Sequence, residues 1–236
     1  MFSTVVDLWH KLADPQPAPP PALVLVTGAL ALVSITPRPV WRITRYVVTI
    51  AHEGGHAAAA VLSGRRLSGI RLHSDTSGLT LSKGKPSGLG MVLTGLAGYV
   101  TPSLLGLAGA VLLASGHITA LLWAALVLLP PMLVMIRNVF GVIAITMAGA
   151  VVLVVSMFAA PAVQAAFAYL IVWVLLLGGL RPVVELQTLR WRRQLPNSDA
   201  DQLARLTRVP GLLWVVFFAL VASAALVLGG RLLLLP

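Results

Sequence analysis

Long apolar runs, separated by short polar or proline-containing breaks, dominate this sequence. An α-helix needs about 20 predominantly apolar residues to cross a bilayer, and most of the runs come close to that length. The first run is short, which makes it a weaker candidate than the others. The expected helices cover residues 22–36, 42–63, 89–114, 118–136, 139–158, 162–180 and 211–230. The pattern predicts an all-α polytopic membrane helical bundle with about six to seven transmembrane helices.

Residues 67–87 interrupt this pattern. Apolar and polar residues alternate there on both sides of the turn-forming sequence Asp75-Thr76-Ser77-Gly78. The alternating apolar positions are Ile70, Leu72, Leu79 and Leu81. A period of two around such a turn predicts a small β-hairpin directly after the second helix. Its free edge can pair with an extended substrate segment, or the hairpin can lie at the membrane interface and cover the site.

The composition agrees with a membrane protein. The chain has 236 residues, of which 58% are hydrophobic and 10% are charged, and its mean hydropathy is +0.94. Soluble domains carry about 25% charged residues. No long polar segment is left for a second domain. We therefore expect a polar, proline-rich N-terminal tail over residues 1–21 and a single transmembrane domain over residues 22–236, with the hairpin inserted at 67–87 and a basic cytoplasmic segment at 181–210.

The basic residues determine the expected orientation. The net charge is +10, and in a membrane protein such an excess marks the cytoplasmic ends of spans rather than a nucleic-acid interface. Residues 64–88 hold five basic residues and residues 181–208 hold six. Four predicted spans separate these segments, so both are expected on the cytoplasmic side. Arg38, Arg42 and Arg45 would then face outward. Either the second helix is tilted or only partly inserted, or the first run does not span.

The sequence HEGGH lies near the middle of the second helix. Residues four apart share one face of a helix, so His52 and His56 can hold one zinc ion. Glu53 is close enough to activate a water bound to that ion. A charged side chain in a membrane helix costs at least about 2.5–3.5 kcal/mol, which favours a functional role over a helix end that meets headgroup water. The small residues Ala57–Ala60 allow close helix packing.

The sequence HEGGHAAAA, the hairpin after it and a glycine-rich span resemble the site-2 protease family of zinc intramembrane metalloproteases, in particular its compact bacterial branch without a PDZ domain. The resemblance covers about residues 42–210. It implies that His52 and His56 ligate Zn²⁺ and that Glu53 is the catalytic base. It also implies that an aspartate from a later core helix is the third ligand.

Two motifs of that family are altered in this chain. The second core helix of the family carries a glycine-proline-x-x-asparagine motif, whereas here Gly98 and Pro102 occur at a different spacing and the asparagine is missing. Together with Gly106 and Ala110 they form a stripe of small residues, which either packs against a neighbouring helix or shapes the substrate cleft. The family's aspartate-glycine motif for the third ligand is absent.

The search for a third ligand is short, because the chain has seven acidic residues including Glu53. Asp7 and Asp14 lie in the tail. Asp75 belongs to the hairpin turn, where a structural role is expected. Glu185 follows a span beside basic residues, where an ion pair is expected.

Asp199 and Asp201 remain. Ser198 can cap a helix, and Asp201 three residues later fits a capping box, which leaves Asp199 freer to bind metal. The spacing Pro196-x-x-Asp199 is also similar to the family's proline-containing approach to its ligand aspartate. We favour Asp199, with Asp201 as the alternative. A further alternative is that both residues only cap a cytoplasmic helix.

Other polar residues lie between the predicted spans. Arg137 and Asn138 fit a short cytoplasmic turn, although Asn138 can also hydrogen-bond a substrate backbone. His73 and His117 lie in loop-like segments and are expected to be solvated, with His73 as a remote alternative ligand. Cysteine is absent, which excludes disulfides, thiolate ligands and a cysteine nucleophile.

These observations predict a zinc-dependent intramembrane metalloprotease that cuts membrane-anchored protein substrates in regulated intramembrane proteolysis. We expect a multi-pass protein of a bacterial inner or plasma membrane whose partners are the lipid bilayer and its substrate, without nucleic acid. The altered motifs motivate an alternative: a catalytically degenerate family member that acts as a membrane scaffold or metal-binding protein. A transporter is less favoured, because intramembrane charges are too few for an ion path.

Overall fold

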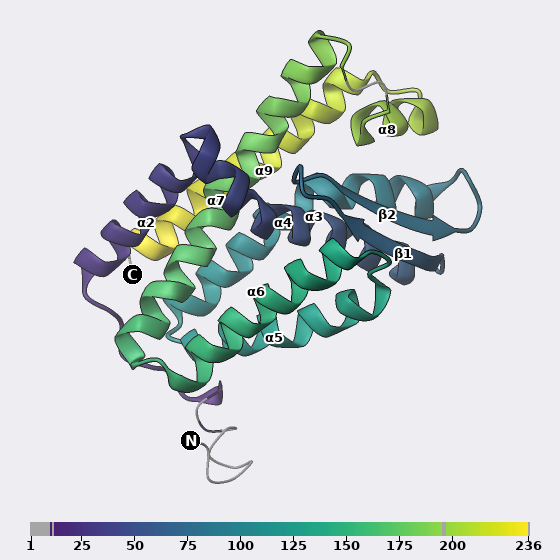
Figure 1. Ribbon diagram of the computed structural model, residues 1–236. Coiled ribbons are helices and arrows are strands. Elements are labelled where there is room, and N and C mark those ends of the chain that lie inside the picture. Colours follow the sequence, from purple (N-terminus) through teal and green to yellow (C-terminus); the bar gives the residue numbers. More distant parts are fainter. Residues whose placement is uncertain (1–9, 11, 195–196, 236) are drawn as a thin grey trace.

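The computed structural model describes residues 10, 12–194 and 197–235 (Figure 1). It consists of helices and one two-stranded antiparallel sheet, which confirms the predicted helical membrane bundle with a hairpin after the HEGGH helix. The elements are α2 (Pro21–Ile35), α3 (Arg38–Leu62), β1 (Arg66–Leu72), β2 (Gly78–Lys83), α4 (Leu89–Ala114), α5 (Ile118–Met135), α6 (Val139–Phe158), α7 (Pro161–Trp191), α8 (Asp199–Thr207) and α9 (Gly211–Leu234).

Five helices in the described part of the chain are long and apolar enough to cross a bilayer, namely α4, α5, α6, α7 and α9. Helices α2 and α3 meet the same criterion only as a pair, and they are bent by 109° at the short break between them. If this pair counts as one broken span, the total is six, at the lower end of the expected number. The helix that carries HEGGH therefore does not meet the criterion for a span by itself.

The α2–α3 corner explains the arginines that did not fit the expected orientation. Arg181 of α7 donates a hydrogen bond to the carbonyl oxygen of Thr36 at 3.1 Å, and Arg45 forms an ion pair with Glu185 at 2.9 Å. The corner and the start of α3 thus lie against the basic end of α7. The choice between a tilted or partly inserted second helix and a first run that does not span stays a prediction.

Three predicted helix boundaries are wrong. Helix α9 ends at Leu234 rather than near residue 230. Helix α3 begins at Arg38, four residues before the expected start, because a proline is tolerated in the first turn of a helix, where its missing N–H has no partner to lose. Helix α7 does not end near residue 180 but continues through Pro182 to Trp191. The Arg181–Glu185 ion pair, four residues apart, supports this continuation. The first part of the predicted basic segment is therefore helical.

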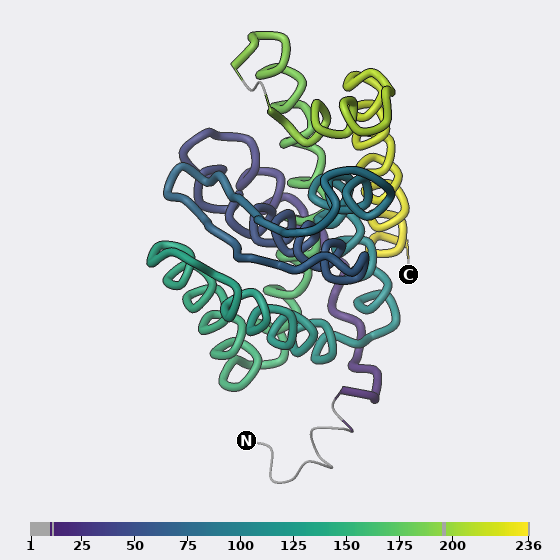
Figure 2. Tube along the Cα trace, turned by 90° about the vertical axis from the view of Figure 1, so that its right-hand side faces the viewer, coloured from purple at the N-terminus to yellow at the C-terminus, as the bar shows by residue number. Residues whose placement is uncertain are grey.

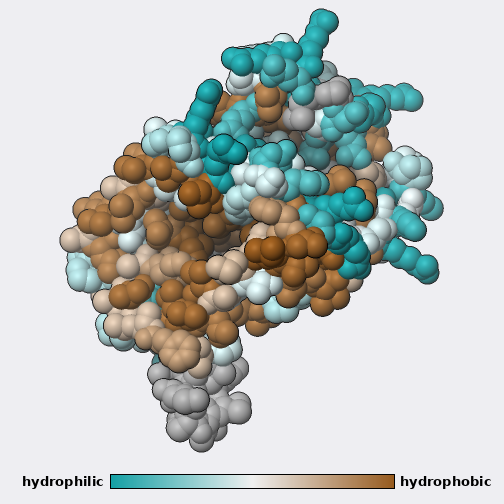
Figure 3. All heavy atoms as spheres, in the orientation of Figure 1, coloured by the Kyte–Doolittle hydropathy of each residue, from teal (hydrophilic) through white to brown (hydrophobic). Residues whose placement is uncertain are grey.

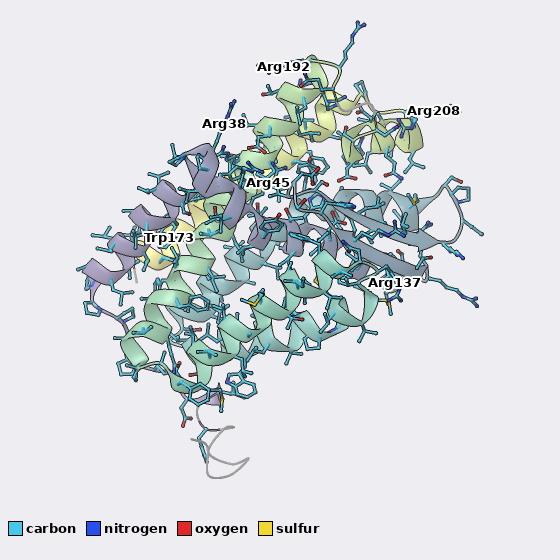
Figure 4. The ribbon with its side chains drawn as sticks, in the orientation of Figure 1. Arg38, Arg45, Arg137, Trp173, Arg192 and Arg208 are labelled. Atoms are coloured by element: carbon cyan, nitrogen blue, oxygen red, sulfur yellow. The ribbon has the colours of Figure 1, made fainter. Side chains whose placement is uncertain are left out.

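Helix α7 is the central element of the bundle. It packs against α2, α4 and α9, and Ala168, Val172 and Leu176 are fully buried in the shared core. Trp173 lies between α7 and α2 (Figure 4), where its ring leaves room only for a glycine or another small residue at Gly28. Small residues thus permit the close helix contacts that hold a membrane bundle together.

The hairpin is held by its first strand. Strands β1 and β2 pair antiparallel, with Leu72 opposite Gly78. The other edge of β1 is also occupied: Ile70 forms a parallel bridge with Ile136, and the side chain of Asn138 bonds both the N–H and the carbonyl oxygen of Leu72, at 3.2 and 2.6 Å. Asn138 is thereby engaged with the hairpin backbone. Among the described residues, none pairs with the outer edge of β2.

The two strands differ in the side chains they bury. Ile70 and Leu72 of β1 are fully buried beside α3, α5 and α6, as their alternation predicted. Leu79 and Leu81 of β2 are instead exposed, at 45% and 46%, and the polar positions between them face inward. The alternation in this strand correctly predicted that its side chains point to two opposite faces. The apolar face, however, is the exposed one.

Polar and apolar surfaces are separated along the molecule. In Figure 3 hydrophilic side chains cover α8, the hairpin and the neighbouring helix ends, whereas hydrophobic side chains cover the opposite part. Arg38, Arg45, Arg192 and Arg208 gather at the end that carries α8 (Figure 4). Figures 1 and 2 both place α8 next to the hairpin and α3. This is the end that the positive-inside rule predicts to be cytoplasmic.

Candidate metal centre

Helix α3 places two imidazoles side by side. The Nε2 atoms of His52 and His56 are 3.0 Å apart, as expected for residues separated by one helical turn. Nδ1 of His56 lies 2.6 Å from the carbonyl oxygen of Thr94. A carbonyl can only accept a hydrogen bond, so Nδ1 carries the proton and Nε2 is left with a free lone pair for a metal.

Helix α4 supports the two rings at close range. A Cβ at Gly98 would overlap with Nε2 of His56 and approach the ring of His52, so this position requires glycine. The neighbouring Tyr99 packs edge-on against His52, with ring centroids 4.8 Å apart, and stacks on Phe218 of α9. Of the two roles considered for the small-residue stripe, Gly98 serves the site, whereas Gly106 permits packing against Leu176 of α7.

Asp199, the first residue of α8, completes a triangle of donor atoms. Its Oδ2 lies 3.3 Å from Nε2 of His52 and 3.3 Å from Nε2 of His56. Ligand atoms around a tetrahedral zinc ion, with bonds of about 2.0–2.2 Å, are separated by about 3.4 Å. Two imidazole nitrogens and one carboxylate oxygen are also a ligand set of catalytic zinc sites. The three residues therefore fit Zn²⁺ in both donor type and spacing.

The charge of Asp199 suits a metal ligand. Burial alone raises the pKa of this carboxyl, but the neighbouring imidazoles of His56 and His52 outweigh that effect and hold its pKa below the ordinary value. Asp199 is therefore ionised at neutral pH.

Asp201, the alternative candidate, has other partners. Its Oδ1 accepts hydrogen bonds from Nε and an NH2 nitrogen of Arg190, at 3.0 and 2.7 Å. The Ser198 hydroxyl donates to Oδ2 of Asp201 at 2.6 Å, and the backbone N–H of Asp201 bonds the Ser198 oxygen at 3.3 Å. The predicted cap at Ser198 is thus present, and Asp201 points away from the imidazoles.

Glu53 lies on α3 directly beside this cluster and is held by the hairpin. It is 4% exposed, and its Oε2 accepts a hydrogen bond of 2.6 Å from the Thr80 hydroxyl. A Cβ at Gly78 would overlap with the Glu53 carboxylate, so a glycine is required for this close approach. Gly78 and Thr80 share one face of β2, and that face fixes the carboxylate.

A cleft of about 520 Å³ joins these groups. Side chains and backbone from α3, β2, α4, α7 and α8 line it, and the three donor residues and Glu53 all contribute. Residues 76–82 line one wall of the cleft, and they include all of β2 except its last residue. Arg45 also lines the cleft. An extended polypeptide placed along β2 would therefore pass the donor triangle.

The remaining acidic and histidine candidates lie outside the cluster. Asp75 accepts hydrogen bonds from the N–H and hydroxyl of Ser77, which is the turn role expected for it, and the same contacts lower its pKa. Glu185 forms the expected ion pairs, with Arg45 and Arg181. The other members of this set are Asp14, which pairs with His10 at 3.7 Å, and His73 and His117, which contact loop residues. Asp7 and Pro196 lie outside the described residues.

Three residues of the site were not found from the sequence. They are Thr94, which orients His56, Thr80, which holds Glu53, and Arg190, which binds Asp201. A weak signal existed for Thr80, since it is the polar position between two leucines of a predicted strand. The contacts of Thr94 and Arg190 depend on tertiary structure alone.

Comparison with known proteins supplies one match. The profile of a family described as Peptidase M50B-like matches residues 25–229, which include all of the residues of the cluster. No curated protein and no solved structure matches the chain.

Proposed function

The chain belongs to the peptidase M50B-like family, and from this premise we propose that it is a zinc-dependent intramembrane metalloprotease that hydrolyses peptide bonds of membrane-anchored substrates. The family supports a peptidase, and the apolar helices support a multi-pass membrane protein. The observation that carries the finer proposal is the donor triangle of His52, His56 and Asp199, with the buried Glu53 in the same cleft.

The roles of the residues follow from their chemistry. His52, His56 and Asp199 would hold Zn²⁺, which supplies a Lewis acid and lowers the pKa of a coordinated water when it is bound. Glu53 accepts a proton from the attacking water at its carboxylate and returns it to the nitrogen of the leaving amine. Thr80 keeps this carboxylate in one orientation through its 2.6 Å hydrogen bond.

The free edge of β2 is the proposed place for the substrate backbone. A peptide bond within a helix is shielded by the helix's own hydrogen bonds, so a membrane-anchored substrate has to be unwound before hydrolysis. Strand addition at β2 would satisfy the backbone groups that unwinding exposes. The cleft lies at the polar, basic end of the molecule. We therefore propose cleavage close to the cytoplasmic boundary of the substrate's span.

The test compares cells that express the wild-type chain with cells that express Glu53→Gln at the same level. New N-termini of membrane proteins are identified by mass spectrometry of isolated membranes. Hydrolysis assisted by Glu53 predicts a set of cleaved termini that is present with the wild type and lost with Glu53→Gln, because proton transfer by such a group contributes about 10²–10⁴-fold to rate. Zinc content of the two purified proteins should be equal.

Asp75→Asn is the matched control, since it also removes a carboxylate charge but leaves an acceptor for Ser77 in an exposed turn. It should preserve the termini produced by the wild type. Identical termini in wild-type and Glu53→Gln cells would exclude the protease. Stoichiometric zinc together with that result would favour the alternative of a metal-binding membrane protein without hydrolytic activity.

A further inference from the structure

Helix α8 is held to the bundle mainly by apolar contacts. It has nine residues, and its Ala200 and Leu203 are fully buried against α4, α7 and α9. Apolar burial is strong but not directional. These contacts keep α8 against the bundle, but they do not fix the rotation of the helix about its own axis. A small rotation would move the side chain of its first residue, Asp199. A zinc ligand on that turn requires a fixed position, since the donor atoms lie only 3.0–3.3 Å apart.

A directional contact is present two residues after the ligand. The guanidinium of Arg190, near the end of α7, bonds Oδ1 of Asp201 through two nitrogens, and the Ser198 hydroxyl bonds the other oxygen. The side chains of Arg190 and Asp201 are only 18% and 24% exposed. Solvent therefore screens this ion pair less than a pair at the surface.

The two aspartates hold α8 from different sides. Residues two apart on a helix point to different faces, so Asp199 reaches the imidazoles while Asp201 reaches α7. The guanidinium is itself enclosed: a Cβ at Gly211, the first residue of α9, would overlap with it. The first turn of α8 is thus linked through Arg190 to the end of α7 and the start of α9.

We infer that Arg190 is a positioning residue for the metal centre, and that its ion pair with Asp201 sets the zinc affinity by holding Asp199 in place. The inference rests on the proposed zinc site. Arg190 touches neither the donor atoms nor the cleft lining. Its effect on zinc passes through Asp199, and this is what separates a positioning role from a general contribution to folding.

The experiment measures the zinc dissociation constant of the purified full-length chain in detergent by competition with a chromophoric chelator. Arg190→Gln should bind zinc about 10- to 100-fold more weakly than the wild type, the range typical for loss of a residue that orients a ligand. Co²⁺ in place of zinc should give a visible spectrum that differs between the two proteins. Arg192→Gln is the matched control, because it removes an exposed arginine from the same helix end and should leave both readouts unchanged.

A mutant cycle tests the route through Asp199. In an Asp199→Ala background, Arg190→Gln should cause no further loss of zinc affinity, because the ligand it positions is already gone. The charge-reversed pair Arg190→Asp with Asp201→Arg should recover part of the affinity that either single change loses. Arg190→Lys keeps the charge but not the two-nitrogen geometry, and it should cause a smaller loss than Arg190→Gln.

The outcomes separate this inference from the proposed function. Stoichiometric zinc in the wild type with equal affinity in Arg190→Gln overturns the positioning role and leaves the zinc site intact. Additive losses from Arg190→Gln and Asp199→Ala also overturn it. A wild type that binds no zinc overturns the proposed site itself. If Arg190→Gln does not fold, the Arg190→Lys protein decides the matter, since wild-type affinity in that protein contradicts the inference.

Discussion

The two sides of the proposed zinc site are built by different means. Helix α3 supplies two imidazoles from consecutive turns, so the spacing of the helix itself sets their separation. Helix α8 supplies one carboxylate from far along the chain, and its place depends on packing against three other helices and on the Arg190–Asp201 ion pair. Local geometry thus specifies one side, and tertiary contacts specify the other.

Removing an imidazole from α3 should have the largest effect. His56→Ala leaves one ligand on α3 and one on α8, which no longer form a preorganised pair. Zinc binding energies of about 10–16 kcal/mol in full sites, shared among four ligands, suggest a loss of about 3 kcal/mol, or roughly 100-fold or more in affinity. Metal analysis of the purified protein after dialysis against a weak chelator measures this. Wild-type zinc content in His56→Ala would contradict the assignment.

Removing the carboxylate from α8 should have a smaller effect. Asp199→Ala keeps both imidazoles on one rigid helix, so zinc affinity should fall by about 10- to 100-fold, less than for His56→Ala. The same chelator competition compares the two variants directly. A larger loss in Asp199→Ala than in His56→Ala would mean that α8, not α3, provides the principal part of the site.

The smallest change tests whether both sides of the site face the same compartment. The chain contains no cysteine, so single cysteines can be introduced without background. Ser74→Cys in the hairpin turn and Arg205→Cys on α8 should be protected from an impermeant maleimide in right-side-out vesicles, whereas Ser115→Cys at the far end of α4 should react. Zinc content should not change.

Inverted vesicles are the control for these labels. There the pattern should reverse, with Ser74→Cys and Arg205→Cys reactive and Ser115→Cys protected. Labelling of Ser74→Cys and Arg205→Cys from opposite sides would contradict the arrangement in which α3, the hairpin and α8 gather at one end.

The sequence predicted the parts of this molecule that depend on neighbouring residues. HEGGH indicated two ligands and a base at helical spacing, and the turn-forming Asp75–Gly78 indicated the hairpin. The interpretation of Ser198 as a helix cap agrees with the hydrogen bonds that occupy Asp201. That local competition is the physical reason why the sequence favoured Asp199 for the metal.

The features that escaped prediction depend on contacts between distant segments. The bend between α2 and α3 is supported by Arg181 of α7, and no local pattern around Thr36 indicates that contact. Helix α7 continues through Pro182 because its neighbours and the Arg181–Glu185 pair support it, although proline disfavours a helix interior. The hydrogen bond from Thr80 to Glu53 likewise requires the hairpin to fold back over α3.

The two hydrogen bonds between the Asn138 side chain and the backbone of Leu72 have a consequence for how a peptide can bind in the cleft. A β-hairpin without further contacts has two unpaired edges. Either edge can pair with an extended peptide or with another copy of the hairpin. Because the start of α6 occupies the edge of β1, the hairpin has one edge left for an added strand. That edge belongs to β2, which lines the same cleft as the donor residues. The hairpin would therefore accept one extended peptide at a time, and always on the side of the proposed zinc site.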